Sequence, residues 1–253
     1  MKYLGFLTVV FFLVACSEDK PKDKPIIDDA DLPIENLSLE EYAKRHIEAQ
    51  LKIPGNEKYE MSIYRANLDG DDKEDAIITV NRLEFAMNEA ATSPNPAKRA
   101  ELGFMGNFNH FFFYDGGLKL ISPTFTIPSS PLVPLKVNFV SLASNDYQDI
   151  QFEFRIRNAA YYDYYSVTNH TPRRVFQWKK FDGLGTKTTE AFSFEYASGT
   201  ASNWKDIIVK KASLSALPDS ANWFTFSPEV KTTNQEIFRF FYLPKELKYV
   251  TKK

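Results

Sequence analysis

The segment from Asn67 to Asp75, NLDGDDKED, most constrains the fold, because strand-like runs flank it on both sides. Residues 59–65 alternate between polar and apolar side chains, and residues 76–80 are apolar and rich in β-branched residues. Side-chain oxygens recur at alternate positions of the segment, so a tight turn would point several of them at one hard cation. The sequence therefore predicts two strands joined by an acidic loop that suits a cation.

This loop resembles the calcium loops of FG-GAP and integrin-type β-propeller repeats, in which spaced acidic residues precede a strand. The resemblance covers residues 67–80 and implies a Ca²⁺ site with a structural role. The implied ligands are the side-chain oxygens of Asn67, Asp69, Asp71 and Asp75 and the backbone carbonyl of Lys73. A solvated acidic turn without a metal is the alternative.

The acidic segment has faint counterparts later in the chain. Residues 67–80 can be overlaid on residues 141–154, and a weaker third copy covers residues 198–209. The matched residues are Leu68 with Leu142, Asp75 with Asp149 and, in the third copy, Asp206. Each copy would be one sheet-like unit that buries its face against a neighbour. Because aspartate often precedes a strand in β proteins, chance similarity is the alternative to a true repeat.

The start of the chain has the features of an export signal. Lys2 supplies a positive charge, and the apolar run from Leu4 to Val14 is too short to span a bilayer as a permanent helix. The run ends in Leu-Val-Ala-Cys, which resembles the bacterial lipobox. That resemblance implies a signal peptide over residues 1–15, a lipidated Cys16 and an anchor in the outer membrane.

Residues 16–36 are predicted to be the lipidated cysteine and a disordered tether, because charges of both signs and proline leave little to bury. Glu18 and Asp19 resemble an acidic surface-export signal, so the periplasmic face and the cell surface are both open. Cys16 is the only cysteine. Its lipidation would leave the mature chain without disulfides and without cysteine catalysis.

Residues 37–253 are predicted to form a single β-rich domain. The 22 Phe and 13 Tyr favour strands. Ser38 and Glu41 form a capping box that opens a short N-terminal helix, which ends before Pro54. The fold class is mainly β, with degenerate propeller-like or sandwich-like strand repeats.

Short helices are predicted at residues 82–91 and 96–102, as an insertion between strands. The strands expected after the insertion cover residues 109–114, 118–121, 136–142, 149–157, 161–167, 174–181, 191–196, 207–211, 223–226 and 236–243.

Familiar catalytic motifs are absent from the sequence, including G-x-S-x-G, H-E-x-x-H and the P-loop. The histidines His46, His110 and His170 are scattered and have no recognisable spaced partner, which argues against zinc. The net charge of −2 without a basic block argues against a nucleic-acid partner.

The run from Tyr161 to Tyr165 is the best candidate for recognition, with Tyr164 and Tyr165 as predicted ligand-binding residues. Exposed aromatic rings can stack on sugars or contact a protein. A strand covered on both faces is the alternative.

The sequence thus predicts an outer-membrane lipoprotein with a binding, scaffold or accessory-subunit role, beside an outer-membrane protein or on a glycan. The competing prediction is a carbohydrate-active or other hydrolytic enzyme whose acidic residues are dispersed along the chain.

Overall fold

The structure, a computed structural model, describes residues 37–216, 218 and 222–251. The chain divides into two units after Ser38, and the fold given below is that of the second, Leu39–Lys253. The predicted signal peptide, Cys16 and the predicted tether lie outside the described residues. Among the residues described, no helix is both long enough and apolar enough to cross a bilayer.

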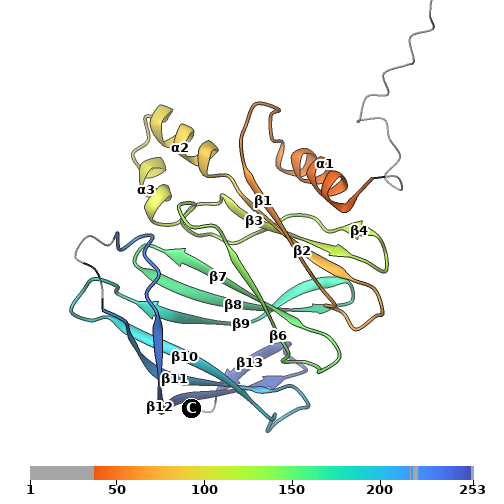
Figure 1. Cartoon of the computed structure of the whole chain (residues 1–253), viewed down its shortest axis with the longest axis vertical. Coiled ribbons are helices and arrows are strands. Elements are labelled where there is room, and N and C mark those ends of the chain that lie inside the picture. The colour runs from red at the N-terminus through yellow and green to blue at the C-terminus, as the bar shows by residue number, and fades with distance from the viewer. Residues whose placement is uncertain (1–36, 217, 219–221, 252–253) are drawn as a thin grey trace, which may run out of the picture. The chain divides into compact units, whose positions relative to one another are not determined.

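Strands dominate the second unit, which confirms the predicted mainly β class (Figure 1). They form two antiparallel sheets, one of five strands and one of eight. The large content of Phe and Tyr is consistent with this outcome, because aromatic side chains pack well on pleated surfaces.

The predicted N-terminal helix is α1 (Leu39–Leu51), which begins directly after Ser38. Its first turn carries Glu40 and Glu41, which interact favourably with the helix dipole. Ala43 and Ile47 are fully buried against the first sheet. The helix therefore covers one face of that sheet.

The first sheet has the order β1-β2-β3-β4, and β5 pairs with β3. Its strands are β1 (Glu60–Ala66), β2 (Asp75–Asn81), β3 (Asn109–Asp115), β4 (Leu120–Ile121) and β5 (Phe125–Thr126). Alternation along β2 and β3 sends Ile78 and Phe112 toward α1, and Ile77 and Phe111 toward the second sheet. Because both faces are covered, every residue of β2 is buried.

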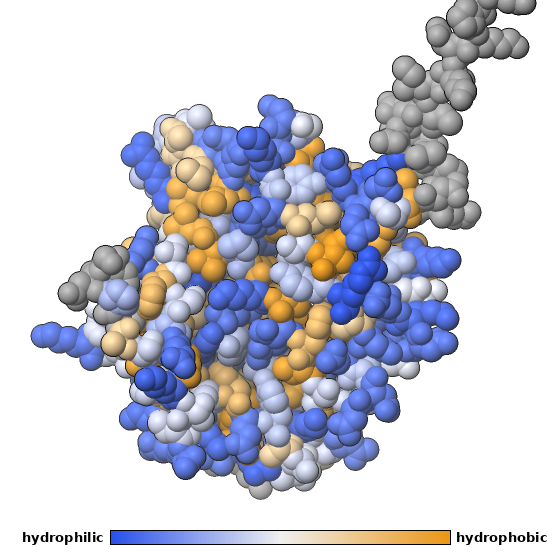
Figure 2. All heavy atoms as spheres, in the orientation of Figure 1, coloured by the Kyte–Doolittle hydropathy of each residue, from blue (hydrophilic) through white to orange (hydrophobic). Residues whose placement is uncertain are grey.

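Two short helices, α2 (Leu83–Thr92) and α3 (Ala97–Gly103), form the predicted insertion between β2 and β3. On the face seen in Figure 2, hydrophobic side chains gather over these helices. Met87 in α2 and Phe104 and Met105 just after α3 are among the exposed large apolar residues.

The second sheet has the order β13-β12-β11-β10-β9-β8-β7-β6. Its strands are β6 (Lys136–Val140), β7 (Asp149–Ile156), β8 (Ala159–Thr168), β9 (Thr171–Asp182), β10 (Glu190–Ala197), β11 (Asp206–Leu214), β12 (Val230–Leu243) and β13 (Lys248–Thr251). β9 and β10 pair only at Asp182 with Glu190 and at Phe181 with Ala191. Beyond these pairs the two strands separate, so the sheet folds over on itself.

Three β layers result from this folding, and Figure 1 shows them one below another. Phe152 of β7 meets Phe111 of the first sheet with ring centroids 4.5 Å apart. On the opposite face of the β7–β9 layer, Phe176 packs against Phe240 at 4.8 Å and Tyr249 at 5.8 Å, in the β12–β13 layer. Each fully buried Phe contributes about 1.5–3 kcal/mol relative to exposure, so these two apolar interfaces hold the layers together.

One predicted strand is wrong. Residues 223–226 form a turn, in which the N–H of Phe226 donates to the carbonyl of Asn222 at 2.7 Å. The side-chain oxygen of Asn222 also accepts from the N–H of Phe224 at 3.0 Å. Asparagine satisfies its own neighbouring backbone in this way and so favours a turn over a strand.

Candidate metal centre

Three hairpins of the fold share one geometry at their loops. In each, the residue before the loop pairs with an aspartate that opens the next strand. The pairs are Ala66 with Asp75, Val140 with Asp149 and Ala197 with Asp206. The loops 67–74, 141–148 and 198–205 therefore have the same length, at the positions where the sequence predicts a repeat.

The aspartate that opens each strand hydrogen-bonds to the backbone of the preceding loop. Asp75, Asp149 and Asp206 are all fully buried. Asp75 Oδ2 accepts from the N–H of Leu68 at 2.9 Å, and Asp149 Oδ2 accepts from that of Leu142 at 2.8 Å. Asp206 Oδ1 likewise accepts from the N–H of Thr200 at 3.1 Å. A carboxylate that accepts backbone N–H groups is a local cap, so this position is a structural corner in all three copies.

The loops are also joined in series. The N–H of Gln148 in the second loop donates to the carbonyl of Asn67 in the first at 2.9 Å. In the same way the N–H of Lys205 in the third loop donates to the carbonyl of Leu142 in the second at 2.8 Å. The acidic loop therefore rests on a hydrogen-bonded neighbour rather than standing alone.

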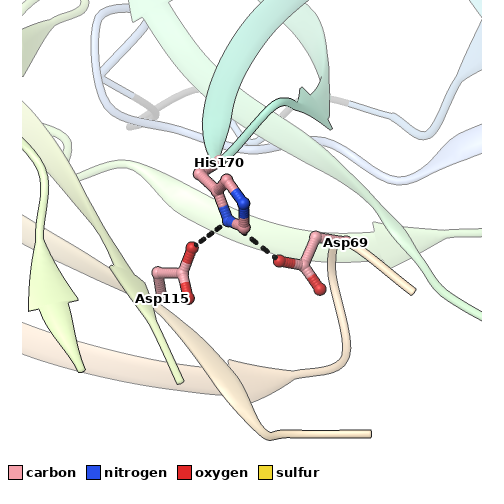
Figure 3. A group of neighbouring side chains, drawn as sticks. All are labelled: Asp69, Asp115 and His170. Carbon is pink, nitrogen blue, oxygen red and sulfur yellow. Dashed lines mark hydrogen bonds and ion pairs between the residues drawn. The ribbon is translucent and has the colours of Figure 1, made fainter. Parts of the chain in front are cut away.

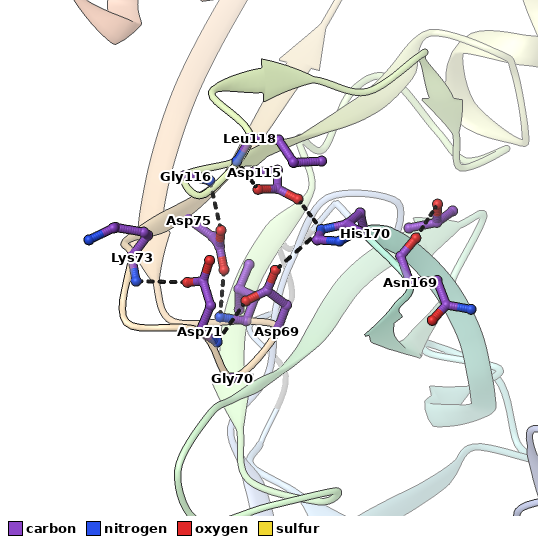
Figure 4. A network of polar contacts seen from close by, with 12 residues as sticks. Asp69, Gly70, Asp71, Lys73, Asp75, Asp115, Gly116, Leu118, Asn169 and His170 are labelled. Carbon is purple, nitrogen blue, oxygen red and sulfur yellow. Dashed lines mark hydrogen bonds and ion pairs between the residues drawn. The ribbon is translucent and has the colours of Figure 1, made fainter.

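Within the acidic loop, the predicted ligands hydrogen-bond to the loop's own backbone (Figure 4). The N–H of Gly70 donates to Asn67 Oδ1 at 3.1 Å, and Gly70 has a φ of +85°, which glycine adopts without strain. The N–H of Asp71 donates to Asp69 Oδ1 at 3.0 Å. Asp71 Oδ1 accepts from the N–H of Lys73 at 2.7 Å. These bonds use one oxygen of each of the two carboxylates and leave the other free of the loop backbone.

Asp75 points inward and has both oxygens engaged, because its Oδ1 accepts from the N–H of Gly116 at 2.9 Å. Burial raises the pKa of the Asp75 carboxyl to about 6, and the negative charges of Asp69 and Asp115 add to the rise. The N–H groups of Gly116 and Leu68 oppose it. Asp75 thus holds the acidic loop against the hairpin that follows β3.

Figure 3 shows a cluster that brings Asp69 together with two residues that the sequence did not assign to a site, Asp115 and His170. One ligand atom from each residue lies within 4.8 Å of the others. His170 Nδ1 is 2.7 Å from Asp115 Oδ2 and 3.8 Å from Asp69 Oδ2. The side chains of Asp69 and Asp115 are 10% and 4% exposed, whereas that of His170 is 57% exposed. The two carboxylates form the floor of the cluster and the imidazole covers it.

Different elements deliver these three side chains. Asp69 lies in the loop between β1 and β2, and Asp115 is the last residue of β3, where its Oδ1 accepts from the N–H of Leu118 at 2.7 Å. His170 lies in the two-residue turn between β8 and β9, where Asn169 and His170 have φ values of +49° and +58°. Both residues are thus in the left-handed region, as the type I′ two-residue hairpin turn requires.

The chemistry of the cluster is that of cation binding or of a histidine–carboxylate pair. Two carboxylate oxygens and one imidazole nitrogen are common ligands of divalent cations. The interactions of Nδ1 within the cluster are with carboxylates, not with a hydroxyl or thiol that could act as a nucleophile. The sequence alone did not assign Asp115 and His170 to this site, because both lie far from Asp69 along the chain.

The predicted ligand-binding tyrosines belong to the core. Tyr164 is fully buried, and its hydroxyl accepts from Gln151 Nε2 at 2.7 Å and lies 3.0 Å from that of Tyr196. The ring of Tyr165 packs edge-on against Phe111 in the first sheet, with centroids 5.2 Å apart. The prediction of a surface site at Tyr164 and Tyr165 therefore does not fit their positions, because layers cover both faces of β8.

Cys16, the predicted lipidation site, lies outside the described residues. Comparisons of the chain with protein-family models, with curated proteins and with solved structures find no match.

Proposed function

We propose that the chain is a lipid-anchored envelope protein with a binding, scaffold or accessory-subunit role, whose loops are fixed by a divalent cation. The convergence of Asp69, Asp115 and His170 supports the cation. The Leu-Val-Ala-Cys motif supports the anchor, with Cys16 lipidated in the outer membrane and the domain on its periplasmic face or at the cell surface. An outer-membrane protein or a glycan is the proposed partner.

The electrostatics of the cluster favour a bound cation. Asp69 and Asp115 add to the rise in the pKa of Asp75, which shows that the three carboxylates lie near one another behind the imidazole of His170. A protonated imidazole would balance only one of the charges. A divalent ion bound here would offset the mutual repulsion of these carboxylates.

Calcium is the proposed ion, because the acidic loop offers mainly oxygen ligands. Asp71 is a further proposed ligand, because its Oδ2 lies next to Gly117 in the β3–β4 turn that follows Asp115. Calcium takes six to eight oxygen ligands, whereas an imidazole nitrogen suits zinc and other transition metals. The contribution of His170 therefore distinguishes the two kinds of ion.

The proposed role of the ion is structural. Asp69 and Asp115 belong to the first sheet and its loops, whereas His170 lies on the turn from β8 to β9 in the second sheet. An ion bound by all three would link the two sheets beside the apolar core that joins them. It would also stiffen the loops without occupying a substrate cleft.

A glycosidase has less support from the geometry. The 440 Å³ cavity is lined by residues such as Tyr59 and Met87, and the 580 Å³ cavity by residues such as Trp178 and Phe238. Neither Asp69 nor Asp115 lines either cavity. Neither of these two cavities therefore places a sugar beside the close carboxylate pair.

Thermal melting of the full chain in detergent tests the proposal, first with a chelator and then with added Ca²⁺, Mn²⁺ or Zn²⁺. An ion at about 100 times its Kd stabilises by about 2.7 kcal/mol, which corresponds to a rise in Tm of roughly 5–10 °C for a domain of this size. We expect this rise with Ca²⁺, its loss in Asp115→Asn, and its retention in His170→Gln.

Asp72→Asn is the matched control, because Asp72 is in the same loop and its side chain is 89% exposed. It should keep the response to Ca²⁺. A Tm that is unchanged by the chelator and by each of the three ions would overturn the cation proposal. A response restricted to Zn²⁺ and abolished in His170→Gln would replace calcium with a transition metal.

A further inference from the structure

A cavity of about 580 Å³ opens between β9 and the β10–β12 layer, within the size range of small-molecule sites. Its apolar walls include Trp178 of β9, Phe192 of β10, and Ile237 and Phe238 of β12. Lys211 of β11 also lines it. The cavity combines an aromatic wall with a cationic group, and it is separate from the acidic cluster.

The divergence of β9 from β10 creates this space. The last shared pair is Phe181 with Ala191, and Trp178 and Phe192 lie where the strands have already separated. Their rings meet edge-to-face with centroids 6.3 Å apart. Trp178 Nε1–H is buried without a hydrogen-bond partner among the described residues. Because this polar atom is buried, a ligand in the cavity would meet the rings of Trp178 and Phe192.

An irregularity in β12 adds the outer wall. Val209 pairs with Phe238, but the next residue of β11, Lys210, pairs with Glu236, which leaves Ile237 as an extra residue. Ile237 and Phe238 both line the cavity, and they are 37% and 38% exposed. Neighbours on a regular strand point to opposite faces, and a bulge re-aims a side chain. Two large apolar side chains are thereby left partly in water beside the cavity.

The charges around the cavity single out one lysine. Lys179 is bonded to Asp182 at 3.0 Å and to Glu190 at 3.2 Å. Nearby lysines are paired as well, Lys180 with Glu153 at 2.7 Å and Lys210 with Glu195. Lys211 is opposite Phe192 in the sheet and, within the described part of the chain, forms no ion pair. It is the cation available to a ligand.

We propose that this cavity binds a small amphiphile with an apolar body and a single carboxylate. The body lies against Trp178, Phe192 and Phe238, where it removes apolar surface from water. The carboxylate pairs with the exposed side chain of Lys211, which lines the same cavity, through a charge-assisted interaction. The inference gives the proposed binding role a ligand class, and it does not depend on the cation.

A conjugated fatty acid that fluoresces on entering an apolar site, cis-parinaric acid, tests this inference on the full chain in non-ionic detergent below its micelle concentration. Its methyl ester serves as the uncharged twin. We expect saturable binding of the acid, with quenching of tryptophan emission, and an affinity for the ester about two- to fivefold lower. Phe238→Ala should weaken binding of both probes at least tenfold.

The charge is tested by Lys211→Met, which should weaken binding of the acid about two- to fivefold, as expected for an exposed ion pair, and leave binding of the ester unchanged. Lys44→Met is the matched control, because Lys44 is exposed on α1 and does not line the cavity, and it should bind both probes as the wild type does. Circular dichroism and melting show that each variant folds. Binding that does not saturate, or equal loss in the two lysine variants, would overturn the proposal.

Two further measurements test this inference independently of the proposed cation site. Binding of the acid that persists in chelator supports a cavity independent of the metal centre, whatever the melting experiment shows. If soluble cello- or chito-oligosaccharides displace the probe at lower concentration than dodecanoate does, the site is a glycan site and the amphiphile proposal is wrong.

Discussion

Asp149 Oδ2 accepts a 2.8 Å hydrogen bond from the N–H of Leu142, as Asp75 Oδ2 does at 2.9 Å from that of Leu68. In the second loop the same oxygen also accepts from Ala143 at 2.8 Å. This shared bond identifies the aspartate that opens each of these strands as a loop cap, with or without a metal.

Asp149→Ala should therefore destabilise the fold although the second loop lacks most of the carboxylates. The change leaves two backbone N–H groups without their acceptor, at about 1–3 kcal/mol each. Burial raises the pKa of Asp149, because the charged carboxylate is unfavourable inside the fold. Removing the carboxylate removes this burial cost and so offsets part of the loss. We expect a net loss of about 1–3 kcal/mol in urea unfolding.

Asp146→Ala in the same loop is the control, because Asp146 is exposed and its side chain only meets the Ser144 hydroxyl at 3.5 Å. It should change stability by less than about 0.5 kcal/mol. Equal effects of the two substitutions would contradict the capping role.

His110 gives the fold an acid-sensitive element away from the acidic loop. Burial lowers the pKa of His110 to about 4, and the positive charge of Arg82 adds to the effect. The unfolded chain binds the proton near the ordinary value of about 6.5, so this contribution to stability is complete above pH 6.5 and is lost as the pH falls toward 4.

Urea unfolding of the wild type and of His110→Phe at pH 7.5, 6 and 5 measures this contribution. Asp75 acts in the opposite direction, because its raised pKa makes the folded state gain a proton first as the pH falls. The difference between the two proteins isolates His110. We expect His110→Phe to become more stable relative to the wild type by about 1.2 kcal/mol between pH 6 and 5, and a constant difference would contradict the prediction.

Local patterns predicted the parts of the fold that local forces decide. The helix after Ser38, the α2–α3 insertion and the strand after each aspartate follow from caps, periodicity and turn residues. The strand expected at residues 223–226 failed for a local reason as well, because Asn222 bonds to its own neighbours. A strand pattern does not show when a preceding side chain favours a turn.

The sequence patterns did not predict which residues far apart in the chain lie together in the fold. Asp115 and His170 meet Asp69 only because the sheets bring three turns to one place, and no spacing in the sequence encodes that meeting. The alternation at Tyr164 and Tyr165 showed that their side chains point to opposite faces. It did not show that a β layer covers each face, which is a property of the whole topology.

The predicted lipid anchor can be tested by Cys16→Ser in the native bacterial envelope. The wild type should partition into the detergent-rich phase of Triton X-114 and fractionate with outer membranes, because several acyl chains on one cysteine hold firmly. Cys16→Ser should leave the membrane fraction with its melting temperature unchanged.

Ser17→Asp is the companion variant, since an aspartate after the cysteine resembles an inner-membrane retention signal. It should keep the lipid but move the protein to inner membranes. Membrane association of Cys16→Ser equal to that of the wild type would contradict the anchor.

Tyr164 should matter for stability and not for recognition. Tyr164→Phe removes a buried hydroxyl that meets Gln151 and Tyr196, and each such bond contributes about 0.5–1.5 kcal/mol. Gln151 keeps its contact with Tyr196 at 3.2 Å, so we expect a loss of about 1 kcal/mol and a Tm lower by roughly 2–4 °C.

Tyr165→Phe is the matched substitution on the other face of β8, where the ring packs against Phe111 and Phe152. It keeps that aromatic packing and should lower the Tm by less than Tyr164→Phe does. Both variants should bind parinaric acid as the wild type does, because neither residue lines the cavity beside Trp178. Loss of probe binding in a folded Tyr164→Phe protein would return this tyrosine to the ligand site and move the site into the core between the layers.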